Sequence, residues 1–158
     1  MTKPLVAYFS CTGTTERLAK ALSAQVGADL YRIEPATPYT PADLNWRDDN
    51  SRSSVEMRDP QSRPGVAGEP LDLIEYDVIY LGAPIWWGVP PTIVNTFLET
   101  HDFSGKTIVP FVTSGSSGVG ETDARLRASC SEQTGWRPAT RLDSATSPDQ
   151  LRLWAESA

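Results

Sequence analysis

Three glycine-bearing loops hold the residues of this chain that are best suited to chemistry. Each follows a short apolar run: residues 10–15 (SCTGTT), 82–88 (GAPIWWG) and 113–118 (TSGSSG). The first loop offers hydroxyls and backbone N–H groups to a phosphate. The second offers the aromatic faces of Trp86 and Trp87, and the third offers small polar groups and open backbone. Together the loops predict a pocket for a phosphorylated, flat, redox-active ring.

The first loop has the features of an anion site. Gly13 stands at the start of a predicted helix, where free N–H groups and the positive end of the helix dipole favour negative charge. The Gly-Lys-[Ser/Thr] sequence of triphosphate loops and the dinucleotide fingerprint G-x-G-x-x-G are both absent. A monophosphate therefore fits this loop best. The residues expected to hold it are Ser10, Cys11, Thr12, Gly13, Thr14 and Thr15.

Alternating strands and helices are predicted to position these loops. Strands are expected at residues 5–9, 30–33, 77–82, 107–112 and 140–142, and helices at 14–26, 91–101, 121–130 and 147–154. Strict alternation favours parallel pairing with right-handed crossovers, hence an α/β fold with a doubly wound five-stranded sheet and helices on both faces. Ligands of such sheets bind beyond the carboxyl ends of the strands, where all three loops lie.

Two stretches are harder to interpret. The segment from Glu34 to Leu73 holds six prolines, and only residues 42–57 suggest a polar helix within a long surface loop. Pro110 interrupts the strand at 107–112, which counts against a fully paired central position there. We expect a single domain over residues 1–158.

Composition narrows the class of protein. The 158 residues include 20 acidic and 14 basic side chains, a net charge of -6 that disfavours nucleic acid as a partner. Two cysteines do not make a disulfide framework or a metal site. The first apolar run is too short for a secretory signal, and no stretch approaches the length of a membrane span, so we expect a cytoplasmic protein.

The loops resemble those of the flavodoxin family. Residues 9–15 (FSCTGTT) resemble its aromatic-S-x-T-G-N-T phosphate loop, with Thr14 in place of asparagine. Residues 81–91 (LGAPIWWGVPP) resemble the second loop of short bacterial flavodoxin-like proteins in its P-I-W-W-G form, and residues 113–118 take the place of their third loop. The resemblance implies a flavodoxin-like fold with strand order 2-1-3-4-5 and FMN as the cofactor. The ring is then expected at Pro84, Ile85, Trp86, Trp87, Gly88, Thr113, Ser114, Gly115 and Gly118.

The same resemblance implies electron transfer, and two forms of it stay open. One is a carrier that shuttles electrons between a reductase and a client enzyme, and the other is an NAD(P)H-dependent quinone or flavin reductase. The third loop has no aromatic residue, so the second face of the ring is either open or covered by Tyr39 or Trp46. Acidic residues in the middle of the chain suit a basic redox partner. They are Asp48, Asp49, Glu56, Asp59, Glu69, Asp72 and Glu75.

A phosphatase is the alternative from a different class. Cys11 and Arg17 fit the C-x5-R phosphate loop of low-molecular-weight tyrosine phosphatases, in which a thiolate attacks the substrate. The Asp-Pro general acid that those enzymes carry late in the chain is missing, which argues against this alternative. We interpret His101 as a cationic helix cap and Cys130 as a packed or surface thiol.

Overall fold

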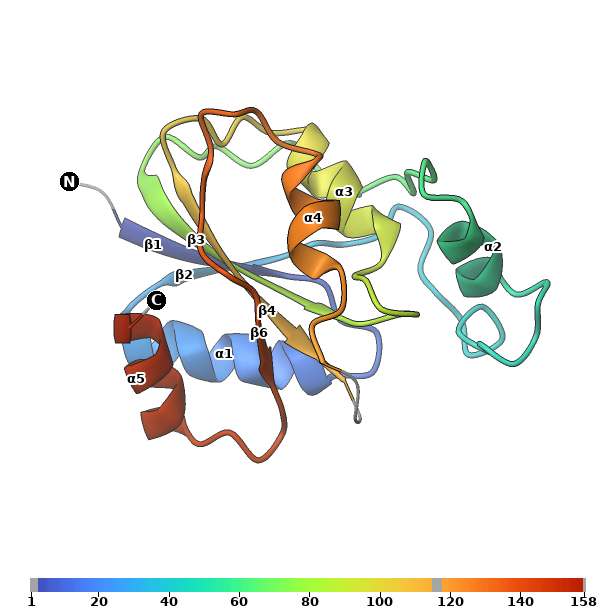
Figure 1. Cartoon of the computed structure of the whole chain (residues 1–158), viewed down its shortest axis with the longest axis horizontal. Coiled ribbons are helices and arrows are strands. Elements are labelled where there is room, and N and C mark those ends of the chain that lie inside the picture. The colour runs from blue at the N-terminus through green and yellow to red at the C-terminus, as the bar shows by residue number, and fades with distance from the viewer. Residues whose placement is uncertain (1–2, 115–117, 158) are drawn as a thin grey trace.

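A parallel sheet with helices on both faces forms the core of the computed structural model (Figure 1), which describes residues 3–114 and 118–157. The strands are β1 (Lys3–Tyr8), β2 (Asp29–Arg32), β3 (Tyr76–Pro84), β4 (Thr107–Thr113), β5 (Gly135–Trp136) and β6 (Thr140–Leu142). The helices are α1 (Thr14–Val26), α2 (Arg52–Arg58), α3 (Thr92–Glu99), α4 (Thr122–Arg127) and α5 (Pro148–Ser157). The predicted α/β class is therefore confirmed.

The strand order is β2-β1-β3-β4-β5, with every pair parallel, as predicted. The expected fifth strand is split, however, because β5 pairs with Thr107 and Ile108 whereas β6 pairs with residues 111–113 of β4. Pro110 lies opposite Leu81 of β3 and faces the gap between β5 and β6. Proline has no N–H to donate, so the interruption of the outer ladder lets β4 sit inside the sheet.

Two hydrophobic clusters, one on each face of the sheet, hold the layers together. Odd-numbered residues of β1 pack with α3 and α4, as Leu5, Ile93 and Leu126 show. Even-numbered residues of β1 pack with α1 and α5 on the other face, as Val6 and Leu22 show. Each large side chain that is buried in this way contributes about 1.5–3 kcal/mol to stability. The period of two along β1 thus places the helices on both faces.

The helix ends show where local signals were sufficient. The predicted helix over 14–26 is confirmed, and it ends at Gly27 in the left-handed conformation. A capping box starts α5: the Ser147 N–H donates to Gln150 Oε1 at 2.8 Å, and the Gln150 N–H donates to Ser147 Oγ at 3.1 Å. The helix after β4 is shorter than expected, since residues 129 and 130 bond three residues back and close the last turn.

Residues 36–65, called the excursion below, leave the body of the protein through a narrow neck. Pro35 and Val66 form an isolated antiparallel bridge at that neck, and the excursion projects to one side with α2 at its centre (Figure 1). The helix expected at 42–57 is wrong in extent. Asn45 and Asp48 accept hydrogen bonds from backbone N–H groups two residues on, which competes with helix formation and delays the helix to residue 52.

Candidate functional site

A cavity of about 640 Å³ opens beyond the carboxyl ends of β1, β3 and β4. Three loops and the excursion line it. The wall consists of Ser10, Cys11, Thr12 and Thr15 from the first loop, Pro84, Ile85, Trp86 and Trp87 from the second, Ser114 from the third, and Leu44, Trp46 and Ser53 from the excursion. A volume of this size is typical of small-molecule and cofactor sites.

A second cavity of about 520 Å³ shares part of that wall and extends toward β6. Thr14, Thr113 and Arg141 line it, together with the loop that follows β6. Gly13, Gly88 and Gly118 are not among the residues that line either cavity, although Thr12, Thr14 and Trp87 beside Gly13 and Gly88 are. Gly115 lies outside the described residues.

The first loop leaves backbone donors available at the start of α1. Gly13 is the N-cap residue, and no side chain of the described residues caps the helix. The Gly13 N–H donates to Ser10 Oγ at 3.1 Å, which closes the loop on itself. The next N–H groups, those of Thr14, Thr15 and Glu16, precede the first bond inside the helix, which the Arg17 N–H makes to Gly13 O at 3.0 Å. An anion is the ligand that suits such an end.

A buried hydroxyl pair ties the first loop to the third. Thr15 Oγ1 and Thr113 Oγ1 lie 2.8 Å apart, and both residues are buried. One of the two hydroxyls donates to the other, so at least one hydrogen-bonding site of Thr15 is occupied within the protein. The pair holds the start of α1 against the end of β4, beside the cavity.

The second loop contains a tight, strained turn from Trp86 to Val89. The Trp86 N–H donates to Val89 O at 2.7 Å, and the two residues between them have positive φ, 53° at Trp87 and 85° at Gly88. Trp87 is the one non-glycine residue with positive φ in the described chain, a conformation that is costly for a large side chain. Such strain persists only where surrounding contacts hold it, so the turn is held in place by the structure around it.

The two tryptophans of that turn have different environments. Trp86 is half-buried in an aromatic cluster, with ring centroids 6.1 Å from Phe9 and 5.7 Å from Tyr39. Trp87 is 54% exposed at the mouth of the cavity. Trp86 therefore offers a positioned wall, whereas Trp87 stands at the entrance.

The excursion is anchored behind Trp86 by a polar network. The Tyr39 hydroxyl donates to Glu56 Oε1 at 2.5 Å, and Arg52 Nε donates to Glu56 Oε2 at 2.9 Å. The Arg52 guanidinium lies 3.8 Å from the centroid of the Tyr39 ring. Burial, together with the bond to Glu56, raises the pKa of Tyr39, so its phenol stays protonated and keeps donating. Trp46 lines the cavity as one of the two residues expected to cover the ring, while Tyr39 packs against Trp86 instead.

Comparison with known proteins decides the family. A family model described as flavodoxin matches residues 3–158. The chain belongs to the flavodoxin family. No match was found among curated proteins.

Solved structures agree with this assignment. Two Bacteroides proteins provisionally described as flavoproteins, from B. eggerthii and B. uniformis, are each 46% identical to this chain with a TM-score of 0.92. The alignment covers 99% of this chain and 98% of the B. eggerthii protein, and 98% of each chain for B. uniformis. A flavoprotein from Lactobacillus acidophilus, solved in complex with FMN, is 19% identical over 89% of this chain and 93% of its own, with a TM-score of 0.69, and shares the fold.

Cys11 of this flavodoxin-family chain is poorly suited to nucleophilic catalysis. Burial raises its pKa to about 11, and the positive charges of Arg32 and Arg52 oppose this shift only in part. Arg17, the other member of the C-x5-R pattern, is exposed on α1. A phosphatase nucleophile needs a lowered pKa, so the geometry argues against that alternative.

The remaining histidine and cysteine have structural roles. His101 Nδ1 lies 2.8 Å from the Phe97 carbonyl, and its Nε2 accepts a hydrogen bond from the Leu71 N–H at 2.9 Å. His101 therefore caps the end of α3, as expected, and ties it to the segment before β3. Cys130 is half-buried against the core, and burial raises its pKa to about 11.

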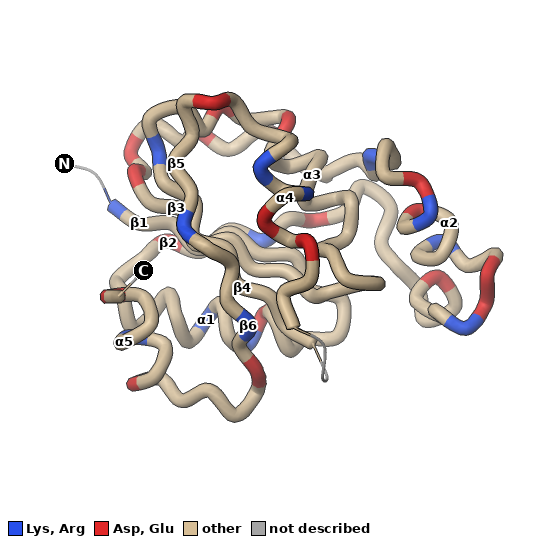
Figure 2. Tube along the Cα trace, in the orientation of Figure 1, with Lys and Arg blue, Asp and Glu red and all other residues tan. Residues whose placement is uncertain are grey.

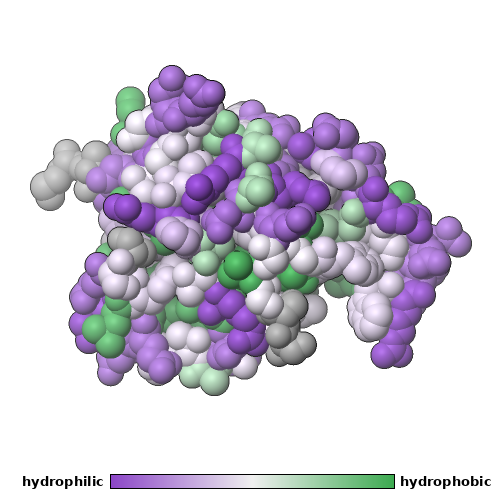
Figure 3. All heavy atoms as spheres, in the orientation of Figure 1, coloured by the Kyte–Doolittle hydropathy of each residue, from purple (hydrophilic) through white to green (hydrophobic). Residues whose placement is uncertain are grey.

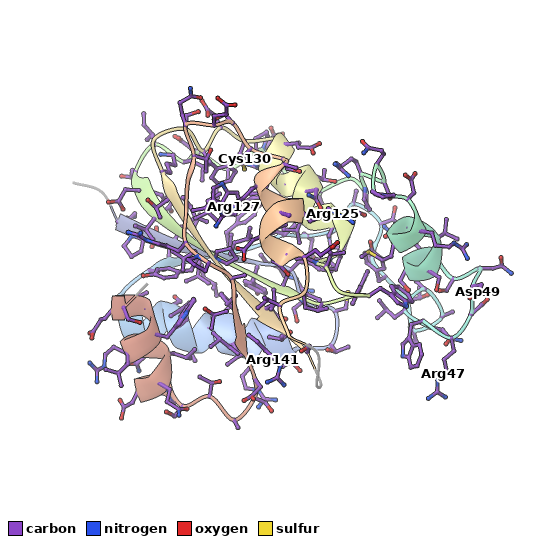
Figure 4. All side chains as sticks on the ribbon, in the orientation of Figure 1. Arg47, Asp49, Arg125, Arg127, Cys130 and Arg141 are labelled. Atoms are coloured by element: carbon purple, nitrogen blue, oxygen red, sulfur yellow. The ribbon has the colours of Figure 1, made fainter. Side chains whose placement is uncertain are left out.

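Several residues that line the two cavities were not expected from the sequence, among them Leu44, Ser53 and Arg141. Leu44 and Ser53 come from the excursion, whose irregular pattern shows no period from which their position follows. Arg141 extends from β6 (Figure 4), and its Nε and Nη2 each lie 3.0 Å from Ser114, at the hydroxyl and the carbonyl respectively. The rule that ligands bind at strand exits, applied to residues 140–142 as well, points to Arg141.

None of the helices in the described residues is long and apolar enough to cross a membrane.

Proposed function

We propose that this protein binds FMN and carries electrons in the cytoplasm between a reductase and a client enzyme. The family match and the FMN-bound relative with the same fold support FMN as the cofactor. One observation carries the proposal: the cavity combines the uncapped start of α1 with an aromatic wall. This pairing suits a ligand with a phosphate at one end and a flat ring at the other.

The residues of the cavity fit FMN. N–H groups at the start of α1 and the hydroxyls of Ser10 and Thr12 would bind the phosphate. Trp86, fixed by Phe9 and Tyr39, would pack on the ring and keep water from one of its faces. When bound, FMN exchanges electrons singly or in pairs. The chain itself supplies orientation, a phosphate anchor and control of access.

The second candidate function is a reductase that moves electrons in pairs to a quinone. The exposed aromatic residues at the mouth of the cavity favour it. Trp46 is 62% exposed and Trp87 is 54% exposed, and both line the same opening. Exposed aromatic faces beside an open cavity suit a flat substrate that enters and leaves. The carrier remains our proposal, since the sequence has no dedicated nicotinamide motif.

A partner that docks beside the excursion fits the carrier. Figure 2 shows acidic and basic residues interleaved along the excursion, and Figure 3 shows that its outer side is mainly hydrophilic. Arg47 and Asp49 lie at its outer end (Figure 4), next to the exposed Trp46. Glu56 is engaged by Arg52 and Tyr39, so the acidic docking residues would be Asp48 and Asp49 rather than Glu56.

Anaerobic reduction of the FMN-loaded protein tests this function. A carrier should give an organic radical signal in electron paramagnetic resonance midway through a dithionite titration, and NADPH alone should bleach the flavin slowly. Rapid bleaching by NADPH without a partner protein, followed by reoxidation on addition of a quinone, would instead establish the reductase.

A further inference from the structure

The turn that carries both tryptophans is held by the segment that leads into α4. The carbonyl oxygen of Gly88 accepts a hydrogen bond from the Glu121 N–H at 3.0 Å. Glu121 is the N-cap residue of α4, so this bond joins the second loop to an element on the sheet's α3–α4 face. Because Gly88 is one of the two central residues of the turn, its orientation determines that of Trp87.

Gly120 makes this bond possible because it leaves room for the carbonyl. A Cβ atom at position 120 would lie 2.1 Å from Gly88 O, 2.9 Å from Gly88 C and 3.1 Å from Gly88 Cα. All three atoms belong to the backbone, so no side-chain rotation relieves the contact. Gly120 also has a φ of 56°, which disfavours any side chain there. Space and backbone conformation thus both require glycine.

We propose that Gly120 is a positioning residue for the flavin-binding turn, acting through the bond between Glu121 and Gly88. It lies in neither cavity wall, and its effect on a ligand passes through Trp86 and Trp87. The strained φ of 53° at Trp87 needs contacts that hold it, and the bond from Glu121 is one of them. The inference rests on the proposed binding of FMN in the cavity.

A matched pair of variants separates this contact from backbone strain alone. Gly120→Ala introduces both the strain and the contact with Gly88. Gly27→Ala introduces a similar strain, at a φ of 65°, but its Cβ meets nothing within 4 Å. Gly27 ends α1, at the end remote from the first loop. The two variants should lose similar thermal stability from strain, and differ in what happens at the turn.

The first measurement uses the flavin-free protein and so does not depend on FMN binding. Amide hydrogen exchange of Glu121, followed by NMR, reports the bond to Gly88 directly. We expect Gly120→Ala to exchange this amide at least ten times faster than wild type, and Gly27→Ala to keep the wild-type rate. Equal protection in all three proteins would overturn the proposal, whatever the cofactor.

The second measurement is the FMN dissociation constant, determined by tryptophan quenching well below the unfolding temperature. Gly120→Ala should weaken binding tenfold or more, and Gly27→Ala should stay within twofold of wild type. Equal affinities of the two variants would overturn the link between Gly120 and the site. A wild-type protein that fails to bind FMN would refute the proposed function and leave the exchange result standing.

A further variant covers the case in which Gly120→Ala does not fold. Glu121→Pro removes the N–H that donates to Gly88 and keeps glycine at position 120, and the proline ring also draws the φ of residue 121 from -98° toward about -65°. It should weaken FMN binding in the same direction, by tenfold or more. Wild-type affinity in Glu121→Pro would contradict the proposal.

Discussion

At the amino ends of the strands polar side chains satisfy one another, whereas at the carboxyl ends donors remain available. Lys3 pairs with Asp29 at 2.8 Å, Tyr76 donates to Asp29 at 2.7 Å, and Lys106 donates to the Tyr76 carbonyl at 2.7 Å. At the opposite edge the start of α1 has no side-chain cap among the described residues, and a cavity of about 640 Å³ lies beside it. Below, the amino ends of the strands are called the closed edge of the sheet, and their carboxyl ends, beside the cavity, are called the open edge.

The two ends of the strands differ in the property that a substitution there should change. The bonds among Lys3, Asp29 and Tyr76 hold the starts of β1, β2 and β3 together at the closed edge. At the open edge the hydroxyls of Thr15 and Thr113 bond each other, whereas the N–H groups at the start of α1 have no side-chain cap among the described residues. Changes at the open edge should therefore alter binding, and changes at the closed edge should alter stability alone.

The largest effect is expected from removing the ligand's phosphate. Riboflavin has the same ring as FMN but cannot use the donors at the start of α1. Each hydrogen bond to a charged group contributes about 1.5–3 kcal/mol, so two such bonds correspond to a loss of affinity of at least about a hundredfold. Parallel titrations of FMN and riboflavin check this. Equal affinities would show that the first loop does not hold the phosphate.

The next effect concerns the aromatic wall. Trp86→Leu removes the ring beside Phe9 and Tyr39 and keeps an apolar side chain. Stacking on an aromatic residue is worth about 1–3 kcal/mol, so FMN affinity should fall roughly five- to 150-fold. Trp136→Leu is the control. Trp136 lies on β5 opposite Ile108, near the amino end of β4, and packs against the core away from the cavity. If both variants bind FMN as wild type does, Trp86 is not part of the site.

A smaller effect is expected at Cys11, which lies at the open edge without being an available nucleophile. Its pKa of about 11 means that the thiolate forms only as the pH rises toward that value. In a Cys130→Ser background, alkylation at pH 8 should be at least about tenfold slower than for an ordinary cysteine with a pKa near 8.5, because the loss of thiolate outweighs the greater nucleophilicity of a more basic thiolate. Fast alkylation at that pH, or turnover of a phosphatase substrate, would reopen the phosphatase alternative.

The smallest effect on binding is expected at the closed edge. The hydrogen bond from Lys3 is the largest of the effects that lower the pKa of Asp29, and the bond from Tyr76 lowers it further. A lowered folded-state pKa stabilises the protein above the unfolded pKa of about 3.9, and this stabilisation is lost as the pH falls through the folded value. Unfolding temperatures of wild type and Asp29→Asn should therefore differ near neutral pH and converge at low pH. FMN affinity should be the same in both, and a change would contradict the division between the two edges.

Much of the open edge could be predicted from sequence because its signals are local. The apolar run before Ser10, the helical spacing after Gly13 and the glycine at 27 determine β1, the first loop and α1 with little help from the rest of the chain. The parallel pairing of the strands followed from their alternation with helices. Their order was expected from the resemblance to the flavodoxin family. The capping box at Ser147 and Gln150 likewise needs only neighbouring residues.

The parts that were missed depend on contacts between distant segments. The wall formed by Leu44 and Ser53 exists because the excursion folds back on Trp86 through Tyr39. No local pattern reports that contact. The requirement for glycine at 120 becomes visible only when the Gly88 carbonyl is seen beside it. Long-range packing, not local propensity, completes the site.

Loading the flavin-free protein with FMN shows directly whether the open edge binds this cofactor. Purified protein freed of flavin is incubated with FMN, passed through a desalting column, and examined by visible absorption and tryptophan fluorescence. If FMN binds there, the protein should retain flavin bands at one FMN per chain and show quenched tryptophan emission. A colourless protein with unchanged tryptophan emission would contradict it.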